Sequence, residues 1–174
     1  MNYLYTTILM IFGVLLFSVA MGALSLAPWV PTRKNDLKRI FELAGLKSGQ
    51  IFYDLGCGVG TTVFYADKKY KLHANGIELG LPFYLICIFR KILSESKNTK
   101  FIWGDFFRTN FSDADAVYLF GLPMSLKKKL AEKLTKELRP GALVISYVFP
   151  IEGWQPKKED GDGEKNAKIY LYVL

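Results

Sequence analysis

The chain has 174 residues, 51% of them hydrophobic, and a formal net charge of +7. Its length suits one domain with a substantial core. Two cysteines without CxxC spacing and a single histidine leave little support for a disulfide framework or a histidine-based triad. We therefore predict no metal site.

The N-terminal segment is free of charged side chains as far as Thr32. Leu4 to Leu26 is almost wholly apolar and, at ~1.5 Å per residue, long enough to cross a bilayer. Basic residues begin at Arg33 and none precede the segment, whereas a cleaved signal peptide needs a basic start. We predict a transmembrane anchor with a short linker over 1–32, a cytoplasmic domain over 33–174, and a single-pass membrane protein whose partner is the lipid bilayer.

Beyond the anchor, helical and β-rich segments alternate, which favours a doubly wound, Rossmann-like α/β fold with a parallel sheet covered on both faces. The predicted helices are 36–44, 61–70, 81–93 and 125–138. The predicted strands are 51–53, 73–77, 100–103, 114–119 and 142–147, with a weak strand at 154–157 that pairs with a last one at 169–173.

A glycine-dense turn, Asp54-Leu55-Gly56-Cys57-Gly58-Val59-Gly60, joins the first strand to a helix. Such a turn lets backbone approach a nucleotide-type cofactor without a Cβ in the way. The spacing is G-x-G-x-G rather than the dinucleotide G-x-G-x-x-G, and Asp54 would repel a pyrophosphate. A cofactor with an ammonium group and no phosphate fits better, which points to S-adenosylmethionine.

Two further carboxylates follow strands at suitable intervals. Glu78 ends the second strand, about 20 residues after the turn, where a carboxylate accepts hydrogen bonds from ribose hydroxyls. Asp105 follows the third strand, from which a side chain can reach an adenine amino group. All three acids are expected at the carboxyl ends of parallel strands, where open α/β sheets bind ligands.

The segment from Leu81 to Leu93 is apolar on all sides until Arg90 and is too short to cross a bilayer. One interpretation is a buried crossover helix started by Pro82. The other is a helix with one face in a membrane interface.

The positive charge has two interpretations as well, attraction to an anionic leaflet or to nucleic acid. The densest run, Lys127 to Lys129, begins an amphipathic helix and is best explained as a solvated face. The acidic segment from Asp160 to Glu164 lacks the glycine position of a calcium loop and is predicted to be a polar hairpin turn.

With these residues placed, the chain resembles a class I (seven-stranded) S-adenosylmethionine-dependent methyltransferase. It is most similar to a membrane-anchored subgroup whose eukaryotic members are mitochondrial protein-lysine methyltransferases of the ATP synthase c-subunit and the adenine nucleotide translocase. The resemblance implies a seven-stranded, mostly parallel sheet with an antiparallel last strand. The segments that carry it are Trp29–Thr32, Tyr53–Gly60, Gly76–Leu79, Asp105–Phe107, Leu119–Pro123, Val148–Pro150 and Gly153–Trp154.

Two departures concern the substrate side. The subgroup often has Asn-Pro after the ribose-binding acid, whereas Gly80 here precedes a displaced Pro82. Arg33 stands where many relatives have proline. The resemblance therefore implies the cofactor but not the methyl acceptor, and the chain looks like a bacterial or archaeal relative.

The implied site has two parts and no residue that can be named as the catalytic base. An Asn-Pro-Pro-Tyr signature of exocyclic-amine DNA methylases is missing, which disfavours nucleic acid. The cofactor-binding set is Asp54, Leu55, Gly56, Cys57, Gly58, Gly60, Glu78, Asp105 and Phe106. The acceptor lip is Thr32, Phe120, Gly121, Leu122, Pro123 and Tyr147.

Three functional hypotheses follow. The first is a membrane-tethered protein methyltransferase, for lysine in a membrane or membrane-proximal substrate. The second is a methyltransferase of a lipid-like small molecule. The third is a non-catalytic module that binds the cofactor or a membrane partner.

Overall fold

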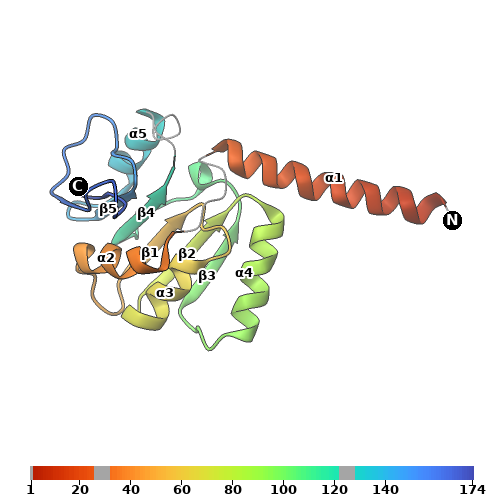
Figure 1. Cartoon of the computed structure of the whole chain (residues 1–174), viewed down its shortest axis with the longest axis horizontal. Coiled ribbons are helices and arrows are strands. Elements are labelled where there is room, and N and C mark those ends of the chain that lie inside the picture. Colours follow the sequence, from red (N-terminus) through yellow and green to blue (C-terminus); the bar gives the residue numbers. More distant parts are fainter. Residues whose placement is uncertain (1, 26–31, 122–127) are drawn as a thin grey trace.

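The structure is a computed structural model that describes residues 2–25, 32–121 and 128–174. Its centre is a seven-stranded sheet with the order β3-β2-β1-β4-β5-β7-β6 (Figure 1). The first five strands run parallel, and β7 is antiparallel to both β5 and β6. The predicted seven-stranded, mostly parallel sheet with an antiparallel last strand is confirmed.

The described helices are α1 (Asn2–Ser25), α2 (Lys34–Ala44), α3 (Thr61–Tyr70), α4 (Leu81–Leu93) and α5 (Lys128–Glu137), with a short 3-10 helix, η1 (Phe106–Arg108). The strands are β1 (Ile51–Leu55), β2 (His73–Glu78), β3 (Thr99–Trp103), β4 (Ala116–Phe120), β5 (Leu143–Tyr147), β6 (Lys158–Asp160) and β7 (Ile169–Val173).

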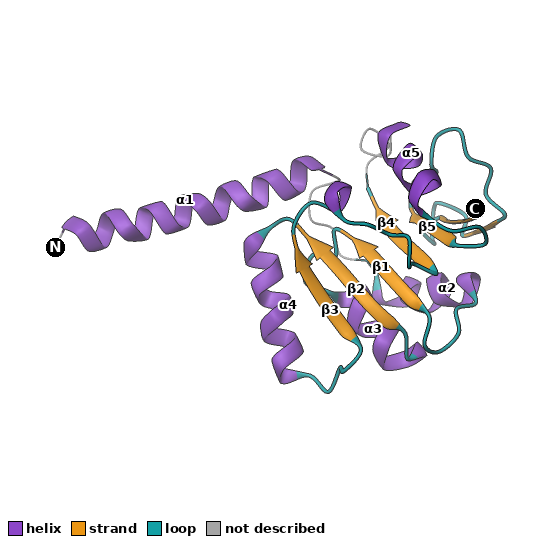
Figure 2. Ribbon diagram, turned by 180° about the vertical axis from the view of Figure 1, so that it is seen from behind, coloured by secondary structure: helices purple, strands orange, loops and turns teal. Residues whose placement is uncertain are grey.

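Helices cover both faces of the sheet (Figure 2). Side chains of α2 and α3 pack with those of β1, β4 and β5 into one hydrophobic cluster, which also receives Cys87 of α4. Side chains of α5, including Leu130 and Leu134, pack into a second cluster on the opposite face. Because the central strands are buried on both sides, they read as continuous apolar runs rather than alternating ones.

The prediction of a transmembrane anchor is wrong. No helix in the described part of the chain is long and apolar enough to cross a membrane. The prediction rested on the length of an apolar run without charges and on the aromatic and basic residues that flank it. In the structure the first turns of α1 also carry two threonines whose hydroxyls bond back to the carbonyl of Tyr3.

The weak strand predicted at 154–157 lies further along, at β6. Pro156 has no N–H to donate, so pairing begins when the Lys157 N–H donates to the Leu171 carbonyl at 2.7 Å. The tryptophan predicted in that strand, Trp154, instead packs edge-on against Tyr172 in the core. The hairpin predicted over Asp160 to Glu164 is confirmed, because β6 and β7 pair antiparallel across it.

Three predictions lie outside the described residues. These are the linker over 26–31, the start at Ser125 of the helix predicted over 125–138, and the lip residues Leu122 and Pro123.

Candidate active site

The glycine turn lies at the carboxyl end of β1, in the middle of the sheet. Gly56, Gly58 and Gly60 have φ of 79°, 54° and 76°, a region that residues with a Cβ rarely adopt. A Cβ at Gly60 would also lie 2.7 Å from a ring carbon of Phe101. The turn is therefore a backbone cradle that other residues would fill or strain.

The underside of the turn is held by α4. The Cys87 thiol donates to the Gly58 carbonyl at 3.1 Å, and the Arg90 guanidinium donates to the Val59 carbonyl. Cys57 lies beside Cys87, and both are buried and free. The predicted structural role of the two cysteines fits this packing, and a hydrogen bond with the Cys87 thiol, together with burial, raises the pKa of the Cys57 thiol.

Glu78, the last residue of β2, lies beside the glycine turn. Its Oε2 accepts from the Gly58 N–H at 2.8 Å and its Oε1 from the Gly80 N–H at 2.7 Å. Burial raises the pKa of this carboxyl, and the backbone N–H donors oppose that shift. Each carboxylate oxygen can accept a second hydrogen bond, so Glu78 can fix the turn and still receive a hydroxyl.

Asp54 is the most perturbed acid at the site. It is 3% exposed, and burial, reinforced by the charge of Glu78, raises its pKa to about 8 while a hydrogen bond from Thr62 opposes the shift. Two buried carboxylates side by side, without a cation among the described residues that contact them, favour a positively charged ligand.

Asp105 follows β3 and accepts from the Phe107 N–H at 2.9 Å, which caps η1. It is only partly buried, so its second oxygen can still meet a ligand. The side chain of Phe106 is turned into the hydrophobic core, 4% exposed, and a cofactor contact is left to its backbone.

The predicted acceptor lip is built around β4 and β5. The Phe120 and Tyr147 rings pack edge to face at 5.3 Å. One position further along, Val148 has φ of 73°, an outlier for a β-branched residue and a kind of strain that gathers at functional sites. Gly121 is buried at the end of β4.

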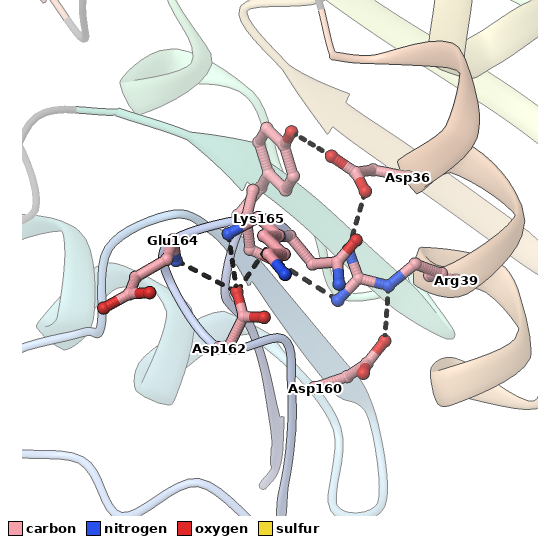
Figure 3. Close-up of polar contacts among 9 residues, drawn as sticks. Asp36, Arg39, Asp160, Asp162, Glu164 and Lys165 are labelled. Carbon is pink, nitrogen blue, oxygen red and sulfur yellow. Dashed lines mark hydrogen bonds and ion pairs between the residues drawn. The ribbon is translucent and has the colours of Figure 1, made fainter.

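The N-terminal segment is pinned over these strands by two tyrosines. Thr32 Oγ1 lies 2.7 Å from the Tyr118 hydroxyl, and the Tyr147 hydroxyl donates to Asp36 Oδ2 at 2.6 Å. Figure 3 shows Arg39 between the carboxylates of Asp36 and Asp160, at 2.6 and 2.8 Å. Thr32 is thereby brought next to β4, whose Tyr118 pairs with Asp54 of β1.

Sequence reasoning missed Thr62, Tyr118 and Asp36. Thr62 lies in the first turn of α3, two residues after the last glycine, and that proximity was an available signal. Tyr118 sits inside an apolar run and Asp36 inside an amphipathic helix, so neither carried a local signal.

The rest of the described chain offers no competing centre. It contains no cluster of three or more metal-ligating side chains. A pocket lined by residues that include Gln50, Asp115 and Arg139 opens at the amino ends of the strands, away from the glycine turn. Arg139 pairs with Asp115 there.

Comparisons with known proteins agree with this geometry. The profile of the ANTKMT methyltransferase domain matches residues 54–158. A protein-lysine N-methyltransferase of Saccharolobus islandicus is 35% identical over 84% of this chain and 93% of its own length. A lysine N-methyltransferase of the ATP synthase c-subunit from Xenopus laevis is 30% identical over 82% of this chain, which spans 62% of that relative.

A solved structure, an RNA methyltransferase from Salinibacter ruber in complex with S-adenosylhomocysteine, superposes with a TM-score of 0.77 at 29% identity. The superposition covers 83% of this chain and 93% of the Salinibacter ruber chain.

The fold and these comparisons define an S-adenosylmethionine-dependent methyltransferase. The chain belongs to the ANTKMT methyltransferase domain family. The glycine cradle and the buried acids fit a cofactor with a cationic amino-acid end, as expected from the sequence.

Proposed function

We propose that this protein is a protein-lysine N-methyltransferase. The observation that carries the proposal is the similarity to a protein-lysine N-methyltransferase over 93% of that relative's length. The shared length includes both the cofactor turn and the strands that form the acceptor side.

In this proposal Asp54 and the backbone of the glycine turn hold the methionine end of the cofactor, which supplies an electrophilic methyl group when bound. Glu78 holds the ribose and Asp105 the adenine. Asp54 must be ionised to pair with the ammonium group, so cofactor binding and loss of the Asp54 proton are linked.

The acceptor amine enters over β4 and β5, where Thr32, Phe120 and Tyr147 form the lip. Methyl transfer from a sulfonium is an in-line displacement, so positioning the nucleophile is the main contribution of these side chains. The lysine must arrive deprotonated. The aromatic edge of Phe120 against Tyr147 shields the approach from water, and a neutral amine is favoured in such surroundings.

The test is to incubate the purified chain with S-adenosylmethionine carrying a labelled methyl group and a native cell extract that contains soluble proteins, membranes and RNA. Labelled methyllysine in acid hydrolysates of the protein fraction supports the proposal. Label confined to lipid or to RNA overturns it in favour of a different acceptor. Glu78→Ala is the control, because labelling by this chain should fall strongly with it, whereas labelling by the extract's own methyltransferases should not change.

A further inference from the structure

Helix α4 exposes an apolar face. Five large apolar side chains are exposed on it: Leu85 (51%), Ile86 (43%), Phe89 (63%), Ile92 (75%) and Leu93 (71%). The other four follow Leu85 by one, four, seven and eight residues, a spacing that puts all five on one face of the helix. Figure 1 shows this helix beside β3 at the edge of the sheet.

The two basic residues of α4 lie on other sides of the helix and donate to backbone carbonyls. Cys87 is fully buried, Arg90 donates to the Val59 carbonyl, and the ammonium group of Lys91 donates to the Thr99 carbonyl. An ordinary surface helix buries its apolar stripe and exposes its charges. The outward face of α4 is therefore not explained by packing among the residues that the structure describes.

The apolar face continues onto neighbouring segments. Trp103, 56% exposed, stacks on Tyr84 with ring centroids 6.4 Å apart, and its indole N–H donates to the Leu79 carbonyl. A tryptophan with an exposed ring and a satisfied N–H is common at membrane–water interfaces. Helix α1 contacts α4 and also exposes large apolar side chains.

The charged residues around this face indicate what kind of surface it would bind. Between Leu81 and Leu93 there are no acidic residues. Just beyond, Lys97 and Lys100 are exposed against a single acid, Glu95. A symmetric contact with a second copy would bring these basic groups together, whereas anionic headgroups complement them.

We propose that the outward face of α4, with Trp103 beside it, docks on an anionic lipid surface, lying in the interface without crossing the bilayer. Because the inward face of the same helix holds the glycine turn, docking would keep the cofactor site one helix away from the lipid. If the proposed function also holds, the acceptor lysines are those close to a membrane surface.

The test uses the full chain with an environment-sensitive fluorophore on Ile92→Cys. Cys57 and Cys87 are buried and should stay unlabelled. The matched control carries the fluorophore on Lys165→Cys, in the exposed loop between β6 and β7. Vesicles are made of phosphatidylcholine alone or mixed with phosphatidylglycerol.

With the mixed vesicles we expect the emission at position 92 to shift to the blue and to be quenched by spin-labelled lipid, while emission at position 165 does not change. Affinity should be about tenfold higher than for phosphatidylcholine and should fall with salt. Phe89→Gln should weaken it about tenfold, with cofactor binding unchanged.

Three results would overturn the proposal. One is the absence of vesicle binding. Another is sedimentation with vesicles while the fluorophore at position 92 stays in water, which would assign binding to another surface. The third is a label at position 92 that is already buried in a dimer without vesicles. None of these readouts depends on methyl transfer, so they leave the proposed function untouched.

Discussion

The replacement Asp54→Asn should stabilise the cofactor-free fold while weakening cofactor binding. In the unfolded chain the carboxyl ionises near its ordinary pKa of 3.8, whereas burial in the fold raises that pKa to about 8. Between those values the folded state holds a proton that the unfolded state has lost, so stability falls as pH rises. Asparagine has the same shape and no charge, and can still meet Thr62.

The magnitude follows from the shift. Between pH 3.8 and about 8, each pH unit lowers the free energy of unfolding of the wild type by about 1.4 kcal/mol. At pH 7 the wild type is therefore less stable than Asp54→Asn by at most about 4 kcal/mol. Chemical denaturation of both proteins should therefore give nearly equal free energies of unfolding at pH 4. The gap should widen up to pH 8 and stay constant above it.

The control is Asp162→Asn. Three backbone N–H groups, those of Glu164, Lys165 and Asn166, donate to Asp162 Oδ1, and they lower the pKa of this exposed carboxyl. The pH dependence of stability expected from Asp162 is opposite to that from Asp54. The stability that Asp162 contributes is present at neutral pH and is lost as the pH falls through its lowered pKa. A gap between Asp54→Asn and wild type that does not change between pH 5 and 8 would refute the account of Asp54.

Three further outcomes are expected. Glu78→Ala should weaken S-adenosylmethionine binding by about 1.5–3 kcal/mol in calorimetry, whereas the same change at the exposed Glu152 should not; equal affinities would remove Glu78 from the site. Gly60→Ala should lower the melting temperature, because its Cβ would meet Phe101 at 2.7 Å and φ is 76°; an unchanged melting temperature would mean that the turn can relax. Thr32→Val and Tyr118→Phe each remove the same hydrogen bond, so each should speed trypsin cleavage after Arg33, and the double variant should be cleaved little faster than either. Fully additive effects would show that this hydrogen bond does not hold the segment.

The sheet, and the positions at its strand ends of the residues proposed to hold the cofactor, could be predicted because their signals are local. Apolar runs mark strands buried on both faces, and three glycines two residues apart mark a turn that requires positive φ. Glu78 and Asp105 follow from where parallel strands end. Each of these inferences needs only a few neighbouring residues.

The acceptor half depends on contacts that no local pattern encodes. Thr32 meets Tyr118 across 86 positions, and Asp36 meets Tyr147 across 111. The sequence also left open which face of α4 is exposed, because a helix that is apolar on all sides gives the same pattern whether its wider face is buried or exposed.

The cofactor side and the acceptor side of the site adjoin at Asp54, which pairs with Tyr118 of β4. Its carboxyl is buried beside Glu78, without a cation in contact among the described residues, an arrangement that costs stability at neutral pH. A fold selected only for stability would place an amide or an apolar residue there. A carboxylate is useful at this position only when a cation arrives, so the instability of the cofactor-free site and its affinity for a sulfonium cofactor have the same electrostatic origin.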